Sequence, residues 1–159
     1  MNKSDKDILK KICEYCITNY SISNSSPIIS SLIYELCKFH NIDAIPVQGI
    51  ITICINNIYS RSFAHCFNVY DGIIIDASIY EYALINKRIE HLIPMYIVDH
   101  IPYHIEYSIQ NPMSEDYRFK FSKEFLSTIS NNIKFMDHIH LKRFNLTNDS
   151  KKQNLFYCH

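Results

Sequence analysis

The chain has 159 residues, of which 47% are hydrophobic, and its 16 Lys and Arg residues balance its 16 Asp and Glu residues. This length and composition predict one domain, residues 1–159, that buries its own core. Zero net charge argues against nucleic acid or an anionic membrane as the main partner. No apolar run approaches the roughly 20 residues of a membrane span. The polar start is not typical of a secretory signal, so we expect a cytoplasmic protein with reduced cysteines.

Helices are predicted in the first part of the chain. A helix is expected over residues 4–18, with Ser4 as its N-cap and acidic residues in its first turn. A second helix is expected from Pro27 to about His40, because its apolar residues recur at the spacing of one buried face. Residues 44–56 are expected to form one or two strands that break near Gly49.

The rest of the chain is predicted to form mostly strands. This order of elements favours an α+β fold with N-terminal helices packed on an antiparallel sheet. The expected elements are hairpin strands at 62–70 and 73–78, a helical or irregular excursion at 80–92, strand pieces at 95–109 interrupted at Pro102, a helix at 114–131, a mixed segment at 132–144 and a fraying tail at 147–153.

The hairpin is the most informative segment. Asp71 and Gly72 lie between apolar alternating runs, and both tolerate the positive φ of a two-residue turn. The turn pairs Phe67 with Asp76 and puts His65 on the same face as Asp76, as diagonal neighbours roughly 7–8 Å apart at the backbone. A carboxylate there can fix the tautomer of the imidazole, as in a nucleophile–base–orienter triad.

A nucleophile would gain most at the start of the second helix, where backbone N–H groups lower its pKa and stabilise an oxyanion. Ser26 occupies this place. Ser26 followed by Pro27 also suits a helix N-cap, so a capping role alone stays open. His65 likewise has the alternative of a core histidine.

The segment from Ser26 to Gly49 resembles the active-site helix and following strand of the transglutaminase-like superfamily, within the papain-like cysteine protease fold. Residues 41–44 match the family's short turn, His65-Cys66-Phe67 its histidine strand and Ile75-Asp76 its aspartate strand. The resemblance covers roughly residues 20–80. It implies a papain-like fold and a Cys-His-Asp triad for acyl transfer, namely hydrolysis or transamidation of a peptide, isopeptide or other amide bond, or acetyl transfer.

The chain departs from the family at the nucleophile, because the family's cysteine falls on Ser26. Three explanations stay open: loss of catalysis, use of Ser26 as nucleophile, or a Cys→Ser replacement. The resemblance implies that position 26 attacks an acyl carbon, that His65 acts as general base and then acid, and that Asp76 orients His65. Oxyanion donors besides the Ser26 N–H are expected from Asn24 or Asn19, with Gln48 a weaker choice.

The predicted function is therefore acyl transfer on a peptide, protein or small acyl substrate, in a form with its nucleophile replaced by serine. The alternative is a non-catalytic module that binds a peptide or protein in the former active-site groove. No cofactor or metal is predicted, since Cys13 and Cys16 lie in mid-helix without a second pair of ligands. Cys66 is expected to point away from His65, and Cys37 and Cys54 are expected in the core.

Overall fold

The computed structural model describes residues 1–20, 25–56, 58–134 and 136, and within them the chain forms an α+β fold. Two long helices come first, and strands with short helical turns follow. The elements are α1 (Lys3–Tyr20), α2 (Ser26–Phe39), β1 (Ile45–Ile55), β2 (Tyr59–Tyr70), β3 (Ile73–Asp76), α3 (Glu81–Ile85), the 3-10 turn η1 (Glu90–Leu92), β4 (Ile97–Val98), β5 (Ile105–Pro112) and α4 (Lys123–Lys134).

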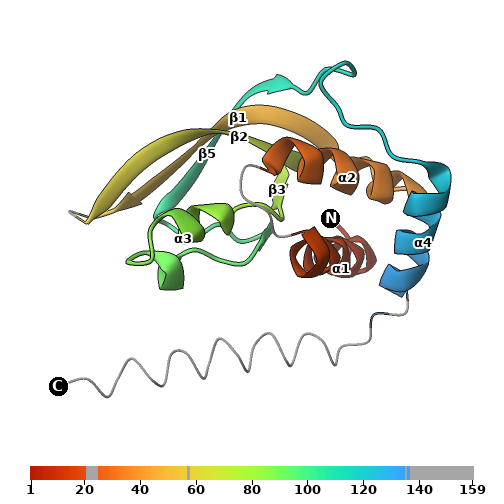
Figure 1. The fold of residues 1–159 in the computed structure, drawn as a ribbon, viewed down its shortest axis with the longest axis horizontal. Helices are drawn as coiled ribbons and strands as arrows, with labels where there is room; N and C mark the ends of the chain where they lie inside the picture. The colour runs from red at the N-terminus through yellow and green to blue at the C-terminus, as the bar shows by residue number, and fades with distance from the viewer. Residues whose placement is uncertain (21–24, 57, 135, 137–159) are drawn as a thin grey trace.

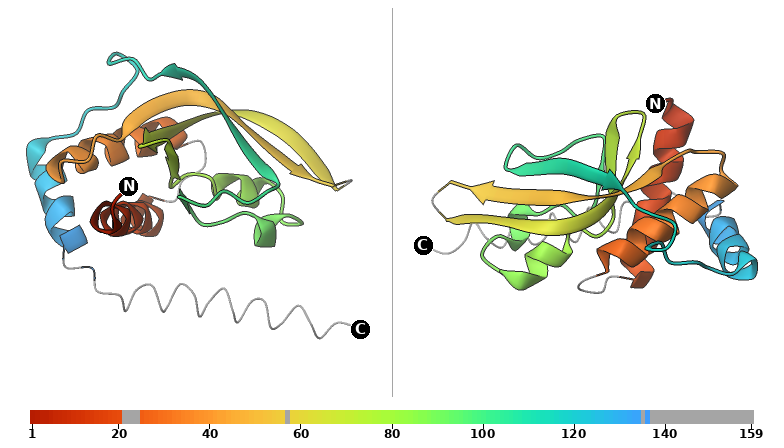
Figure 2. Two further views of the ribbon diagram at one scale, coloured as in Figure 1. Left: turned by 180° about the vertical axis from the view of Figure 1, so that it is seen from behind. Right: turned by 90° about the horizontal axis from the view of Figure 1, so that it is seen from above.

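The five strands form one antiparallel sheet in the order β4-β3-β2-β1-β5. Figure 1 shows the strands arching over the helices, with α2 lying between the sheet and α1. Figure 2 shows the same arrangement from behind and from above, with α4 beside α1 and α2 at the end of the helical layer. The predicted packing of N-terminal helices on an antiparallel sheet is therefore confirmed.

Two cores divide the interior. The first lies where α1, α2 and α4 meet, and it takes Ile75 from β3 and Val98 from β4. The second lies between the long strands and the α3–η1 segment, and it takes Ile97, the sheet partner of Asp76. Because neighbouring residues of β3 and β4 contribute to different cores, Asp76 lies on the side of the second core.

Hydrogen bonds from buried polar groups tie α2 to β2. The hydroxyl of Ser30 donates to the backbone carbonyl of Phe67, and the side-chain amide of Asn68 donates to the carbonyl of Ser30, both at 3.1 Å. The three residues are nearly inaccessible to water. These bonds fix the start of α2 relative to the strand that carries His65.

Two predicted helix starts are wrong. Helix α1 begins at Lys3 and not after Ser4, because the side chain of Asn2 accepts a hydrogen bond from the N–H of Asp5 at 2.7 Å. Helix α4 begins at Lys123 and not near residue 114, because the Ser122 hydroxyl accepts a bond from the N–H of Phe125 at 3.2 Å. A polar run at 114–118 forms turns before it.

Glycine is required at positions 49 and 72 for different reasons. Gly72 has a φ of 75° in the hairpin turn, the backbone region that favours glycine. Gly49 lies within a continuous β1, at a shift in its register with β5. A Cβ at Gly49 would lie 2.2 Å from the carbonyl oxygen of Ser108 and 2.9 Å from the Phe67 ring. The predicted strand break is wrong, and it is lack of space that requires glycine there.

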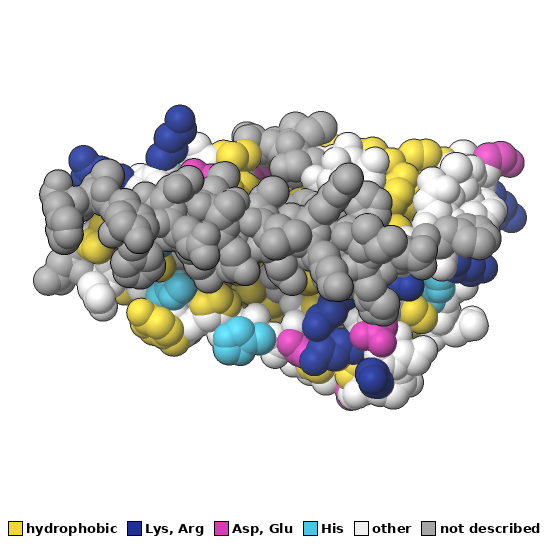
Figure 3. All heavy atoms as spheres, turned by 90° about the horizontal axis from the view of Figure 1, so that it is seen from below, with side chains coloured by type: hydrophobic (Ala, Val, Ile, Leu, Met, Phe, Trp, Pro, Cys, Tyr) yellow, Lys and Arg dark blue, Asp and Glu magenta, His cyan; other side chains and the backbone are white. Residues whose placement is uncertain are grey.

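The surface carries charges of both signs. Figure 3 shows acidic and basic side chains close together on one face of the molecule, as the zero net charge leads one to expect. Among the helices described, none has the length and apolarity needed to cross a membrane. Residues 132–134 of the predicted mixed segment form the end of α4, and Asn24 and residues 137–159, with most of that segment and the predicted tail, lie outside the described residues.

Candidate functional site

The hairpin brings His65 and Asp76 together. Strands β2 and β3 pair Asn68 with Ile75 and Tyr70 with Ile73, which confirms the predicted register. The Nε2 atom of His65 lies 2.7 Å from Oδ2 of Asp76, and both side chains are fully buried. The predicted contact between this histidine and this carboxylate is therefore present.

Asp76 is saturated with hydrogen-bond donors. Its Oδ1 accepts bonds from the backbone N–H and the hydroxyl of Ser78, each at 2.8 Å. Its Oδ2 accepts a bond from the Tyr107 hydroxyl at 2.7 Å as well as the bond from His65. Burial would raise the pKa of Asp76, but the charge of His65 and these donors outweigh it and lower the pKa. The carboxylate is thus held in its charged form.

The other ring nitrogen of His65 faces Glu81 and Tyr82, the first two residues of α3. Nδ1 lies 2.8 Å from the Tyr82 hydroxyl and 3.5 Å from Oε1 of Glu81. Burial would lower the pKa of His65, but the negative charges of Asp76 and Glu81 and their hydrogen bonds outweigh it and raise the pKa to about 9. His65 is therefore an imidazolium at neutral pH, between two carboxylates.

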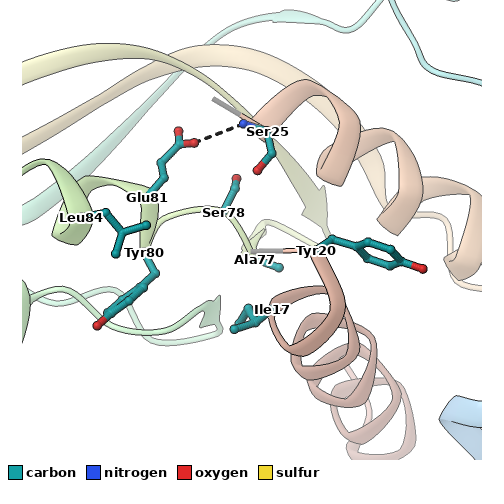
Figure 4. Close-up of a pocket in the computed structure, with 8 residues that line it drawn as sticks. All are labelled: Ile17, Tyr20, Ser25, Ala77, Ser78, Tyr80, Glu81 and Leu84. Atoms are coloured by element: carbon teal, nitrogen blue, oxygen red, sulfur yellow. Dashed lines mark hydrogen bonds between the residues drawn. The ribbon is translucent and has the colours of Figure 1, made fainter. Parts of the chain in front are cut away.

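The side chain of Glu81 accepts a hydrogen bond at the N-terminus of α2. Its Oε2 accepts a hydrogen bond from the backbone N–H of Ser25 at 3.3 Å, drawn as a dashed line in Figure 4. Tyr82 contacts the same carboxylate: burial, the charges of Glu81 and Asp76 and a hydrogen bond with Glu81 raise the pKa of the Tyr82 phenol. Three donors from three different elements therefore surround one carboxylate.

Ser26 is positioned differently from the expectation. It is the first residue of α2, and Ser25 is the N-cap, so the predicted capping role of Ser26 is wrong. The reason is that the carbonyl of Ser25 already accepts the helical bond from the N–H of Ile29, at 2.9 Å. The Oγ of Ser26 accepts a bond from the N–H of Cys66 at 3.3 Å. Within the described residues, no hydrogen bond joins Ser26 to His65.

Of the expected oxyanion donors, Asn19 is engaged elsewhere. Asn19 lies in the last turn of α1, where its side-chain amide donates to the carbonyl of Tyr15 at 2.8 Å. Asn24 lies outside the described residues. Gln48 faces Cys66 across the β1–β2 ladder and is partly exposed. The N–H of Ser25, one residue before position 26, donates to Glu81.

A groove opens beside the start of α2. Its volume is about 570 Å³, within the range of small-ligand pockets, and we call it the α2–α3 groove. Its walls are mostly apolar, and Phe63 and Tyr82 stack with ring centroids 4.4 Å apart. The groove is lined by Ser26, Pro27, Ser62, Phe63, Ala64, Glu81, Tyr82 and Ile85.

A second, much smaller pocket lies on the other side of Glu81 (Figure 4). Its volume is about 10 Å³, close to the least that holds one water molecule. The side chains of Ser25 and Ser78 point into it, and Leu84 and Tyr80 border it. Among the described residues, Glu81 is the one that lines both spaces, so its side chain separates the groove from this inner pocket.

The four buried cysteines of the described residues are poor nucleophiles at neutral pH. Burial raises the pKa of Cys66 to about 11 and that of Cys16 to about 12, and it raises the pKa values of Cys13 and Cys37 as well. Cys66 lies next to Ser26, away from His65, as predicted. Cys54 is exposed and not in the core as expected, because it lies on the outward-facing side of β1. The described part of the chain holds no group of three or more metal-binding side chains.

Glu81, Tyr82, Ser78 and Tyr107 were not identified from the sequence. Strand β3 ends at Asp76 and not at Ser78 as predicted, and Ser78 forms an Asx-type contact with the Asp76 side chain two residues before it, which is a local pattern. Tyr107 comes from β5, and its approach to Asp76 depends on the order of strands in the sheet. Comparisons of the chain with protein-family models, curated proteins and solved structures find no match.

Proposed function

We propose that this chain is a non-catalytic binding module with a papain-like, transglutaminase-like architecture, and that the α2–α3 groove receives a peptide or another amide-bearing ligand. The observation that carries the proposal is the position of Glu81. Its carboxylate lies between the N–H of Ser25 and the imidazolium of His65, where an acyl-transfer enzyme would hold the oxygen of its substrate.

Protonation also argues against turnover. A serine hydroxyl needs a neutral base to remove its proton, and a histidine with a pKa of about 9 is protonated at neutral pH. The Ser26 hydroxyl is bonded to the backbone of Cys66 instead. The paired His65 and Asp76 then serve to hold the hairpin and α3 in place beside the groove.

The groove can be tested with one pair of matched variants. Ile85 lines the groove and is 64% exposed, and Ile58 does not line it and is 66% exposed. We expect N-acetylated Ala-Leu-Phe peptides to shift the NMR signals of Phe63 and Tyr82 and to stay intact by mass spectrometry. Ile85→Asp should abolish the shifts, and Ile58→Asp should retain them. Absence of shifts, or equal effects of the two substitutions, would refute the proposal.

A second function, acyl transfer through position 26, is favoured by one observation. The Nε2 atom of His65 is bonded to Asp76, and Nδ1 faces Tyr82 and Glu81, which line the groove together with Ser26. In that case wild-type protein, and not Ser26→Ala, should cleave the peptides or exchange them onto an added amine.

A further inference from the structure

We infer that the ligand of the α2–α3 groove carries a carboxylate on an apolar group, and that this carboxylate takes the place that Glu81 now holds. The inference rests on the proposed function, since it requires that the groove bind a ligand. It adds the chemical class of the ligand and the residues that would recognise it: Ser25, His65 and Tyr82.

The donors are already arranged around a carboxylate. The N–H of Ser25 lies 3.3 Å from one oxygen of Glu81, and Nδ1 of His65 lies 3.5 Å from the other. The N–H groups that begin the 14-residue helix α2 favour negative charge at this place. The helix start is therefore not the sole feature of the site, because Nδ1 of the buried His65 ring lies 3.5 Å from Oε1 of Glu81 and the Tyr82 phenol hydrogen-bonds to the same side chain.

Glu81 is placed so that it can leave. It is the first residue of α3, a helix of five residues whose Leu84 and Ile85 are more than half exposed. Its side chain is the shared wall of the groove and the inner pocket. Rotation of this side chain into the solvent would join the two spaces and free the N–H of Ser25. The site has donors for one carboxylate, so a ligand carboxylate and Glu81 would compete for it.

The walls of the groove indicate what the carboxylate is attached to. The stacked rings of Phe63 and Tyr82, with Pro27 and Ile85, present apolar surface next to the carboxylate position. An aliphatic or aromatic group would bury apolar area against them, which favours binding. The C-terminus of a peptide that ends in an apolar residue has this chemistry, and so does a small organic acid.

The test compares acid and amide ligands on the folded full chain. Binding of N-acetyl-Ala-Leu-Phe with a free carboxylate, of the same peptide as its amide, and of 3-phenylpropionate is measured by titration calorimetry. The proteins are wild type, Glu81→Ala and the control Glu115→Gln, which alters a carboxylate whose side chain is 89% exposed. We expect Glu81→Ala to bind the acid peptide at least about tenfold more tightly than wild type does, with no gain for the amide.

Each outcome has a definite meaning. Tighter binding of either the acid peptide or 3-phenylpropionate to Glu81→Ala supports the inference, and their relative affinities identify the source of the carboxylate. Equal binding of acid and amide overturns the inference and leaves the proposed function standing. Absence of binding for all three ligands overturns both. If Glu81→Ala does not fold, the wild-type protein decides, since it must prefer the acid over the amide.

Discussion

The hydroxyl of Ser26 accepts a hydrogen bond from the backbone N–H of Cys66 at 3.3 Å and has no such contact with His65. In the sequence, Ser26 and His65 match two members of one triad. In the structure, the carboxylate of Glu81 lies between the start of α2 and the imidazole of His65. This relationship explains how a histidine and an aspartate in triad geometry can lie beside a groove without forming a reactive centre.

His65 should titrate far above a free histidine. The pKa of about 9 predicts that its ring signals in a pH titration by NMR are those of an imidazolium at pH 7. Asp76→Asn should lower the pKa by removing the closest negative charge. A histidine that is already neutral at pH 7 in the wild-type protein would contradict the charge arrangement described above.

The same pKa predicts how stability depends on pH. The pKa of His65 is raised from 6.5 to about 9 in the folded protein, so protonation of His65 stabilises the fold. This stabilisation is complete at a pH below 6.5, the pKa in the unfolded chain, and it is lost as the pH rises through 9. The free energy of unfolding should therefore fall between pH 7 and pH 9.5, by up to about 3 kcal/mol, because each pKa unit corresponds to ~1.4 kcal/mol. Urea denaturation of wild type and His65→Gln measures this, and the variant should lose most of the slope.

Asp76→Asn should strongly destabilise the fold. Removing one partner of a buried ion pair leaves the other charge uncompensated, which costs about 3–5 kcal/mol. The matched control is Asp116→Asn, at an exposed position in a turn, and it should change the free energy of unfolding by less than about 0.5 kcal/mol. Similar effects of the two substitutions would show that the buried pair contributes little.

The Tyr107→Phe substitution tests how much the hydrogen bond from Tyr107 on β5 to Asp76 contributes to stability. The substitution removes the hydroxyl that donates to Oδ2 at 2.7 Å and keeps the ring that packs on Phe67. We expect a loss of about 1–3 kcal/mol in the free energy of unfolding, since the bond is made to a charged acceptor. Tyr103→Phe, at a tyrosine that is 95% exposed, provides the control and should be near neutral.

The sequence predicted the local part of this site and missed the long-range part. The Asp71-Gly72 turn sets the register by itself, so the approach of His65 to Asp76 followed from residues within a dozen positions of one another. Glu81 lies in a segment without apolar periodicity, and its contact with Ser25 depends on how α3 packs. Tyr107 reaches Asp76 from β5, although β1 and β2 separate β5 from β3 in the sheet, and no pattern in the chain specifies this contact.

Gly49→Ala separates lack of space from backbone conformation. A methyl group at Gly49 would collide with the backbone of β5, so the strands must shift, and we expect a loss of about 2–4 kcal/mol in the free energy of unfolding. Gly72→Ala meets no atom within 4 Å and is strained by its positive φ of 75°, for which about 1–2 kcal/mol is expected. A smaller loss at Gly49 than at Gly72 would mean that β5 moves aside easily.

The most direct test of the central claim is the reactivity of a thiol placed at position 26. Ser26→Cys protein is treated with iodoacetamide at pH 7, and the rates of labelling at position 26 and at the exposed Cys54 are compared in the same molecule by mass spectrometry. Our account predicts that position 26 reacts no faster than Cys54, because it is buried and Glu81 occupies the start of α2. Labelling of position 26 on the order of tenfold faster than Cys54, abolished by His65→Ala, would instead establish an assembled nucleophile–histidine pair and contradict the account.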